Sequence, residues 1–393
     1  MKLKKIKIII LILITLTMTG CWNYNELNSI AIITSIAIDK EDDKYEISIL
    51  IANSMNKQSS SEDANSQNVV YSAKGKTLSE ALKNIDLVNP RQNYIGHLSS
   101  VIISEKVAKE GLSDVLDLLF RNSESTKRFY VAIARKDKAK DVLKIISPLE
   151  AFPAQTISTN IKTSSESQAI SVAVVYSEFI ESIIKDGVEP ILPTITIKGN
   201  VKSGSKNSNL EQSDPKASLK LGTIALFKDT KLIDYANYNE SRGINLALNK
   251  VKSMIIQYKC NENYLVAEVK DINTNIDINK NIDTKINIKA TGDIIENNCD
   301  IDLTSPKEIK KIEKSIKKKM NFLVKKGIEL TQKKKVAVYG IGNLVYKKYP
   351  NKFKSIKNWN KYFSNLDISI NIDFNLNSKG SSKQSLKEVL NGN

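Results

Sequence analysis

Histidine and cysteine are scarce in this sequence. Its 393 residues include one histidine, His97, and three cysteines, which lie far apart in the chain. A zinc site draws three or four closely spaced His and Cys ligands. The G-x-S-x-G and H-E-x-x-H motifs of hydrolases and metalloproteases are absent as well. We therefore expect no metal site, no cofactor and no enzymatic activity.

Proline and glycine are also few, with 8 and 15 residues respectively. Their scarcity excludes a collagen-like sequence and argues against long disordered tracts. The composition, 41% hydrophobic and 26% charged, is ordinary for a globular protein. Because a single hydrophobic core stops growing at about 250–300 residues, a chain of this length is expected to form two or three domains.

The apolar run at the N-terminus, residues 8–16, is far shorter than the roughly 20 residues that a membrane span needs. Four lysines within residues 2–7 precede it, and Thr19-Gly20 places small residues directly before Cys21. This arrangement is typical of a bacterial lipoprotein signal, in which residues 1–20 are removed and Cys21 receives a diacylglyceryl group. Two acyl chains anchor a protein stably, so Cys21 is the predicted lipidation site and membrane lipid a predicted partner. The alternative is an ordinary signal peptide followed by a free cysteine.

The chain is strongly basic, with a formal net charge of +16 that becomes +12 once the four lysines of the signal are removed. A basic exported protein can lie against anionic lipid headgroups. The lysines are spread along the whole chain, however, which favours solvated surfaces in a lysine-rich protein. Nucleic-acid binding is not expected, because no aromatic-basic recognition motif is present.

Cys260 and Cys299 are the two cysteines that lipidation leaves unexplained. A pair outside the cytoplasm can form a disulfide. Two cysteines do not establish a disulfide framework, so the sequence leaves the bridge open.

Strand and helix patterns alternate through residues 21–198, which we assign to an N-terminal α+β domain. Residues 30–39 form an apolar run and residues 45–52 alternate, which predicts an antiparallel hairpin around a charged turn. Further strands are expected at residues 69–73, 101–103 and 129–134. Helices are expected at residues 77–88, 105–110, 113–122, 137–145 and 171–185.

Residues 199–218 are rich in Gly, Ser, Asn and Lys and are expected to form a linker-like loop. Residues 219–283 are predicted to form a middle β-rich domain, with hairpins at 219–228/231–235 and 251–258/264–272. Residues 284–393 are predicted to form a C-terminal α+β domain. Its expected elements are strands at 285–290, 336–339 and 366–376 and a long basic amphipathic helix at 306–330. The fold class is thus α+β, with three mixed α/β domains and predominantly antiparallel sheets.

The long helix has the clearest start in the sequence, with Ser305 at the N-cap and Pro306 in the first turn. Its apolar residues recur every three to five positions, and lysines fill the opposite face. Lys314, Lys317 and Lys318 are candidates for contact with a partner or with the membrane. The alternative is an ordinary solvated face over a stripe that packs on a sheet.

Two further features invite a functional interpretation that the sequence does not favour. His97 stands at the start of a predicted strand with no catalytic motif around it, which favours a structural, hydrogen-bonded histidine. Gly340-Ile341-Gly342 lacks the third glycine of a dinucleotide-binding loop, because Val345 stands there. It favours a turn or close backbone packing over a phosphate site.

Several short motifs resemble those of the C-subunit lipoproteins of spore germinant receptors, the Ger(x)C or GerAC-like family. The similarity covers essentially the whole chain after the signal peptide. Its motifs are Cys21-Trp22-Asn23-Tyr24-Asn25-Glu26-Leu27-Asn28, residues 96–105 (GHLSSVIISE), residues 108–112 (AKEGL), residues 221–227 (LGTIALF), residues 240–243 (ESRG) and residues 339–342 (YGIG).

This resemblance implies a non-enzymatic subunit of three α+β domains, anchored by lipid on the outer face of the spore inner membrane. It also implies two integral membrane partners, the A- and B-type receptor subunits, and a role in triggering germination in response to nutrients. A solute-binding lipoprotein of a membrane transporter is the alternative. That class folds as two α/β lobes with hinge crossings, whereas this chain passes one linker and continues into antiparallel strands.

Overall fold

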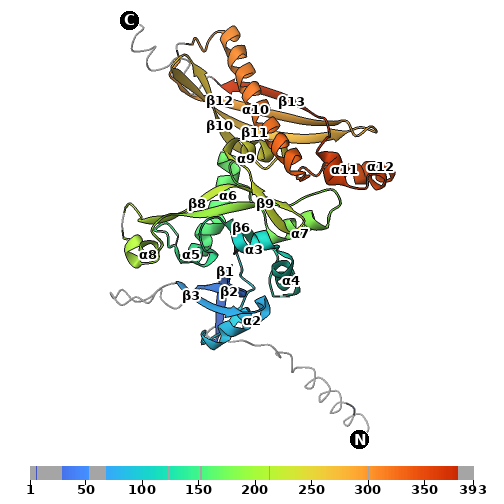
Figure 1. Ribbon diagram of the computed structural model, residues 1–393. Helices are drawn as coiled ribbons and strands as arrows, with labels where there is room; N and C mark the ends of the chain where they lie inside the picture. Colours follow the sequence, from blue (N-terminus) through green and yellow to red (C-terminus); the bar gives the residue numbers. More distant parts are fainter. Residues whose placement is uncertain are drawn as a thin grey trace.

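The computed structural model describes residues 29–52, 68–122, 124–150, 153–211, 213–299 and 301–378, together with the isolated Ile6. Two β-sheets with helices packed against them form the described part of the chain (Figure 1). The α+β class expected from the sequence is confirmed. The predicted signal peptide and Cys21 lie outside the described residues.

The first sheet has the strand order β3-β2-β1-β5-β6-β7-β8-β9, and β4 pairs with the start of β1. The strands β1, β5, β6 and β7 run parallel to one another, and antiparallel strands extend the sheet on both sides. The sheet is therefore mixed, because helical crossovers return the chain in the same direction at its centre. The strands are β1 (Ile30–Glu41), β2 (Lys44–Ala52), β3 (Asn68–Gly75), β4 (Gln92–Tyr94), β5 (Ser100–Ser104), β6 (Tyr130–Ala134), β7 (Ile191–Gly199), β8 (Ala217–Lys228) and β9 (Lys231–Tyr235).

The central strands β5 and β6 are apolar on both faces, as expected of parallel strands covered by helices. Alternate residues of these strands enter two separate core clusters: Val101 and Ile103 belong to one, Ile102 and Ala132 to the other. The second cluster also contains residues of α5 (Ala139–Lys144) and α6 (Pro153–Gln168). The helices packed in the first cluster are α2 (Leu78–Asn84), α3 (Glu105–Glu110), α4 (Ser113–Arg121) and α7 (Tyr176–Ile184).

The second sheet has the order β10-β11-β12-β13, with β13 parallel to β12 and the other pairs antiparallel. The helices α9 (Tyr238–Ala247) and α10 (Pro306–Lys334) pack near it. A disulfide joins Cys260 to Cys299 over a Cα–Cα distance of 6.0 Å, which resolves the question that the sequence left open. The remaining elements are β10 (Ser253–Cys260), β11 (Asn263–Ile278), β12 (Thr284–Asn297), α11 (Ile341–Lys348), α12 (Pro350–Ser355), α13 (Trp359–Phe363) and β13 (Ile368–Ser378).

The segment expected to be a linker connects two strands of the same sheet. Strand β7 extends to Gly199 and pairs antiparallel with β8, and the connection holds α8 (Val201–Gly204) and η3 (Asn207–Asn209). As a result residues 219–283 do not form a sheet of their own: β8 and β9 complete the first sheet, and β10 and β11 begin the second. Backbone pairing over a long distance in sequence decides this, and local composition does not report it.

Two local predictions are corrected by the structure. Residues 336–339 are buried but do not form a strand, because Lys335 and Gly340 on either side take positive φ values of 55° and 70° and turn the chain. The helix expected at 171–185 begins only at Tyr176. Helix α6 was not predicted, since its Ser- and Thr-rich sequence has low helix propensity.

Candidate functional site

The lysine face of α10 lies opposite a buried apolar stripe. Ile312, Ile316 and Met320 are among the residues that pack inward, as the sequence spacing predicts. Lys317 reaches Asp373 of β13 with 4.0 Å between Nζ and Oδ1. Lys314 and Lys318 are exposed and have no acidic partner among the described residues. Their charge is therefore available to a binding surface.

The helices α9 and α10 cross at a pair of glycines. A Cβ at Gly243 would lie 1.8 Å from the Leu323 carbonyl oxygen, and one at Gly327 would lie 2.8 Å from the Ile244 nitrogen. Neither position has room for a side chain, so the two backbones lie in direct contact. The ESRG motif thus supplies the glycine that lets α9 approach α10.

Arg242, in the same motif, is 6% exposed. Its Nη2 donates a hydrogen bond to the Ile255 carbonyl of β10 at 2.5 Å, and its guanidinium stacks over the Tyr238 ring at 5.4 Å. Burial lowers the pKa of this guanidinium. The residue joins α9 to the edge of the second sheet, which is a structural role.

The second glycine of the YGIG motif, Gly342, allows a similar close approach, whereas Gly340 adopts a positive φ of 70° in a turn. Gly342 packs against Gly187, which precedes β7, so closely that a Cβ on either residue would lie 2.6 Å from the Cα of the other. This contact brings the start of α11 against the first sheet's last crossover. The motif provides close backbone packing, as the sequence favoured, and forms no phosphate-binding loop.

Glu189 links the two halves of the protein. The carboxylate is 7% exposed and accepts hydrogen bonds from the Asp229 backbone N–H at 2.6 Å and from the Asn360 amide. The Glu189 backbone N–H donates to the Ala337 carbonyl at 3.0 Å. Burial raises the pKa of Glu189 even though both side-chain contacts favour the ionised form. The residue fixes the β8–β9 turn to the segments around α13.

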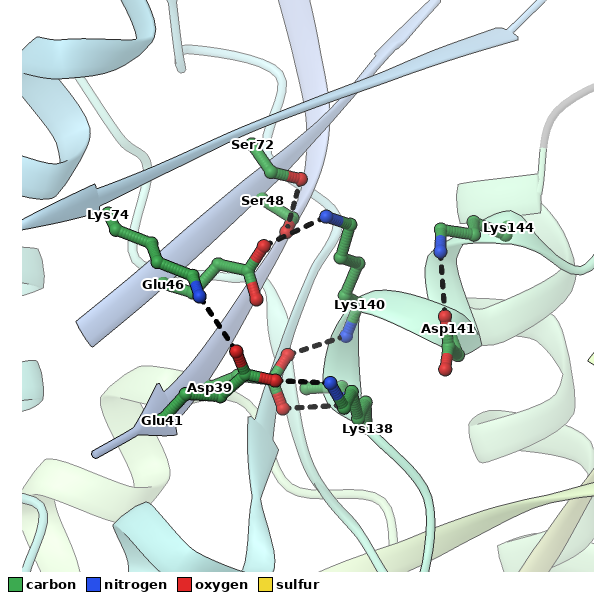
Figure 2. A network of polar contacts seen from close by, with 11 residues as sticks. Asp39, Glu41, Glu46, Ser48, Ser72, Lys74, Lys138, Lys140, Asp141 and Lys144 are labelled. Atoms are coloured by element: carbon green, nitrogen blue, oxygen red, sulfur yellow. Dashed lines mark hydrogen bonds and ion pairs between the residues drawn. The ribbon is translucent and has the colours of Figure 1, made fainter. Parts of the chain in front are cut away.

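A second polar network lies at the carboxyl end of β1 (Figure 2). Asp39 is 4% exposed and accepts backbone N–H groups from Ala139 and Lys140 of α5 at 2.9 and 2.8 Å. The Lys140 ammonium pairs with Glu46 of β2 at 2.8 Å. Burial is the main cause that raises the pKa of Asp39, and the two backbone hydrogen bonds oppose it. Local sequence patterns do not predict this network, because Asp39 and its partners in α5 are about one hundred residues apart.

Glu41 extends the network to the surface. It pairs with Lys138 and with Lys74, the latter at 2.7 Å, and these hydrogen bonds lower its pKa to about 2. A cavity of about 260 Å³ adjoins these residues and includes Ser104 and Glu105 in its lining. The acids of this edge are engaged with backbone N–H groups or lysines, which describes a structural network and leaves no activated nucleophile.

His97 is the remaining residue that the sequence singled out. His97 is exposed, and its ring meets the Tyr94 ring edge-on with 6.1 Å between centroids. The described residues contain no cluster of His, Cys, Asp and Glu that could bind a metal. In the same residues no helix combines the length and hydrophobicity that crossing a bilayer requires.

The fold is that of an α+β protein with two linked sheets, whose most buried charges fix one element to another. Two family descriptions match the chain: the spore germination protein N-terminal domain over residues 23–197, and the spore germination B3/GerAC-like C-terminal region over residues 222–380. The chain therefore belongs to the GerAC-like family of spore germination proteins.

Individual relatives agree with this assignment. Spore germination protein KC of Bacillus subtilis is 26% identical over 373 residues, covering 89% of this chain and 90% of the relative. GerQC of Bacillus cereus is 26% identical over 270 residues, covering 66% of this chain and 70% of the relative. The crystal structure of GerBC shares the fold, with a TM-score of 0.52, 16% identity and coverage of 87% of this chain and 96% of that one.

Proposed function

We propose that this chain is the lipid-anchored C-subunit of a nutrient germinant receptor. It acts without catalysis, on the outer face of the spore inner membrane, together with A- and B-type integral membrane subunits. The observation that carries the proposal is the family match over both halves of the chain, which begins two residues after Cys21. Two relatives that are named as spore germination proteins also support it, because the similarity covers most of their length.

The anchor is proposed at Cys21. Its thiol would form a thioether with a diacylglyceryl group, and the N-terminal signal would be removed. The two acyl chains of such a linkage are sufficient to hold a protein stably at a membrane.

We also propose that Lys314, Lys317 and Lys318 contact an acidic surface of a partner subunit. Helix α10 and the start of β1 lie at opposite ends of the molecule (Figure 1). The anchored end of the chain is therefore remote from the lysine face, which favours a protein partner over the bilayer for this surface.

Deletion of the gene, followed by a nutrient-germination assay, tests the central proposal. Spores without the protein should fail to respond to one class of nutrient, and the wild-type gene should restore the response. A Cys21→Ser chain should lose its lipid in mass spectrometry and move to the soluble fraction. Normal germination of the deletion strain with every nutrient tested would refute the receptor role. Thermal stabilisation of the purified protein by one class of solute would support the transporter alternative instead.

A further inference from the structure

An exposed apolar pair stands at the tip of the segment between α2 and β4. Leu87 ends η2 (Ile85–Leu87) and is 82% exposed, and Val88 beside it is 51% exposed. Single exposed apolar residues are common on protein surfaces and need no explanation. Here two such residues are adjacent in sequence, and both expose more than half of their surface to the solvent. We call Leu87 and Val88 the apolar tip.

The apolar tip is held in a fixed shape from below. Ile85 is fully buried, and its carbonyl accepts backbone hydrogen bonds from Val88 at 3.0 Å and Asn89 at 2.9 Å. The buried Asn89 side chain donates to Asn93 at 2.7 Å. The backbone therefore presents the two apolar side chains outward without further ordering.

The tip lies next to the point where the anchored chain joins the fold. Strand β4 pairs parallel with the first residues of β1, with Ile30 opposite Gln92, and the Gln92 N–H donates to the Ser29 carbonyl at 2.9 Å. Parallel strands begin at the same edge, so the segment before β4 and the segment before β1 approach the sheet from one side. The apolar tip precedes β4 by only four residues.

The length of the anchor limits how far this edge can stand from a bilayer. Ser29 lies eight positions after Cys21 in the sequence. At most about 3.5 Å per residue, the chain between them spans no more than roughly 28 Å whatever its conformation. A lipid at Cys21 therefore keeps Ser29, and with it the edge of the sheet that carries the apolar tip, within reach of the membrane.

The charges around the tip are compatible with a lipid surface. Asp86 is neutralised by Lys83 at 2.6 Å and accepts a further hydrogen bond from Asn93. The acid next to the tip therefore adds no uncompensated negative charge, while leucine and valine suit the boundary between headgroups and acyl chains.

We infer that the apolar tip inserts into the outer leaflet of the bilayer and serves as a second membrane contact beside the lipid anchor. The inference rests on the proposed lipidation of Cys21, which selects this edge. The two contacts together would fix how the protein is oriented, because one flexible tether leaves rotation free whereas a tether and an inserted loop do not.

The test is partition of the unlipidated chain, residues 21–393, into vesicles of phosphatidylglycerol and phosphatidylcholine. The double variant Leu87→Ser/Val88→Ser should partition about tenfold more weakly than the wild type. Leu149→Ser is the matched control, because Leu149 is 92% exposed and lies elsewhere in the chain, and it should leave partition unchanged. A Leu87→Trp chain should gain fluorescence that brominated lipid quenches, beyond any quenching of Trp22 and Trp359 in the parent chain.

Equal partition of the wild type and the double variant would overturn the inference, as would an unquenched Leu87→Trp signal. If the double variant keeps its partition but loses co-purification with the membrane subunits, the tip contacts protein and the inference is again overturned. These assays use unlipidated protein and therefore test the apolar tip alone. Mass spectrometry of the native N-terminus tests the lipid anchor separately.

Discussion

Buried carboxylates fix elements that are distant in sequence. Asp39 ends a strand and accepts the first backbone N–H groups of α5, so that a single side chain sets where this helix begins. Hydrogen bonds to an ionised acceptor are stronger than neutral ones, and they offset part of the cost of burying the charge. The raised pKa of Asp39 shows that burial is the larger of the two effects.

Asp39→Asn should lower the free energy of unfolding by about 1–3 kcal/mol, because the amide places a donor against a backbone N–H. A raised pKa means that the folded state binds the proton of Asp39 more tightly than the unfolded state does. Its contribution to stability therefore falls as the pH rises from the ordinary value of 3.8 towards the raised one. The stability deficit of the variant should accordingly be largest near pH 4 and shrink towards pH 7 in urea titrations.

The exposed turn residue Asp42 provides the control for this measurement. It takes a positive φ of 49°, which asparagine tolerates well, so Asp42→Asn should leave the free energy of unfolding close to that of the wild type. A deficit that grows with pH in Asp39→Asn would contradict the assigned direction of the pKa.

At the scale of the element, α10 has two faces with different tasks. Its inner face combines an apolar stripe with Gly327, where the α9 backbone crosses in direct contact. Its outer face carries the lysines. The helix of 29 residues holds eleven lysines and three glutamates, a strong imbalance that no packing requirement explains.

Reversing two of these charges, Lys314→Glu with Lys318→Glu, should weaken co-purification with the membrane subunits at least tenfold at low salt. Added salt should reduce the difference, because exposed charges are screened. Folding should be unaffected, since neither lysine has an acidic partner among the described residues. Lys202→Glu with Lys206→Glu makes the same change of net charge in the connection between β7 and β8 and should bind normally. Equal binding by both double variants would remove the lysine face from the proposed interface.

At the scale of the whole molecule, the two sheets share one apolar core cluster, and a few polar and backbone contacts also link them. Glu189 binds the β8–β9 turn and Asn360, Gly187 meets Gly342, and α9 connects the last strand of one sheet to the first of the other.

Glu189→Ala should lower the free energy of unfolding by about 2 kcal/mol, because it removes two part-buried hydrogen bonds to a carboxylate. The fluorescence of Trp359 in α13 reports on the second half of the molecule. Circular dichroism reports on both halves. The variant should therefore unfold in urea with the two signals separated, whereas the wild type should show one transition. Asp186→Ala, in the same loop but exposed, should behave like the wild type. Coincident signals in Glu189→Ala would show that the sheets are held together elsewhere.

The local elements were largely predictable. The hairpin of β1 and β2, the hairpins of β8/β9 and β10/β11 and the start of α10 at Pro306 all follow from periodicity and capping residues close in sequence. The strand expected at 336–339 failed because apolar content alone does not distinguish a buried turn from a strand. Helix α6 was missed because the packing of Ile157 and Ile161 overrides weak propensity.

The sequence by itself determined the α+β class, the family and the candidate anchor, since each depends on short motifs or on period. Only the tertiary structure decided that β8 returns to the first sheet, that Cys260 meets Cys299, and that Asp39 caps α5. It also placed the apolar tip beside the first strand. These features depend on contacts between residues that lie from dozens to about a hundred positions apart. Local preferences do not determine such contacts, because the partner depends on how the whole chain folds.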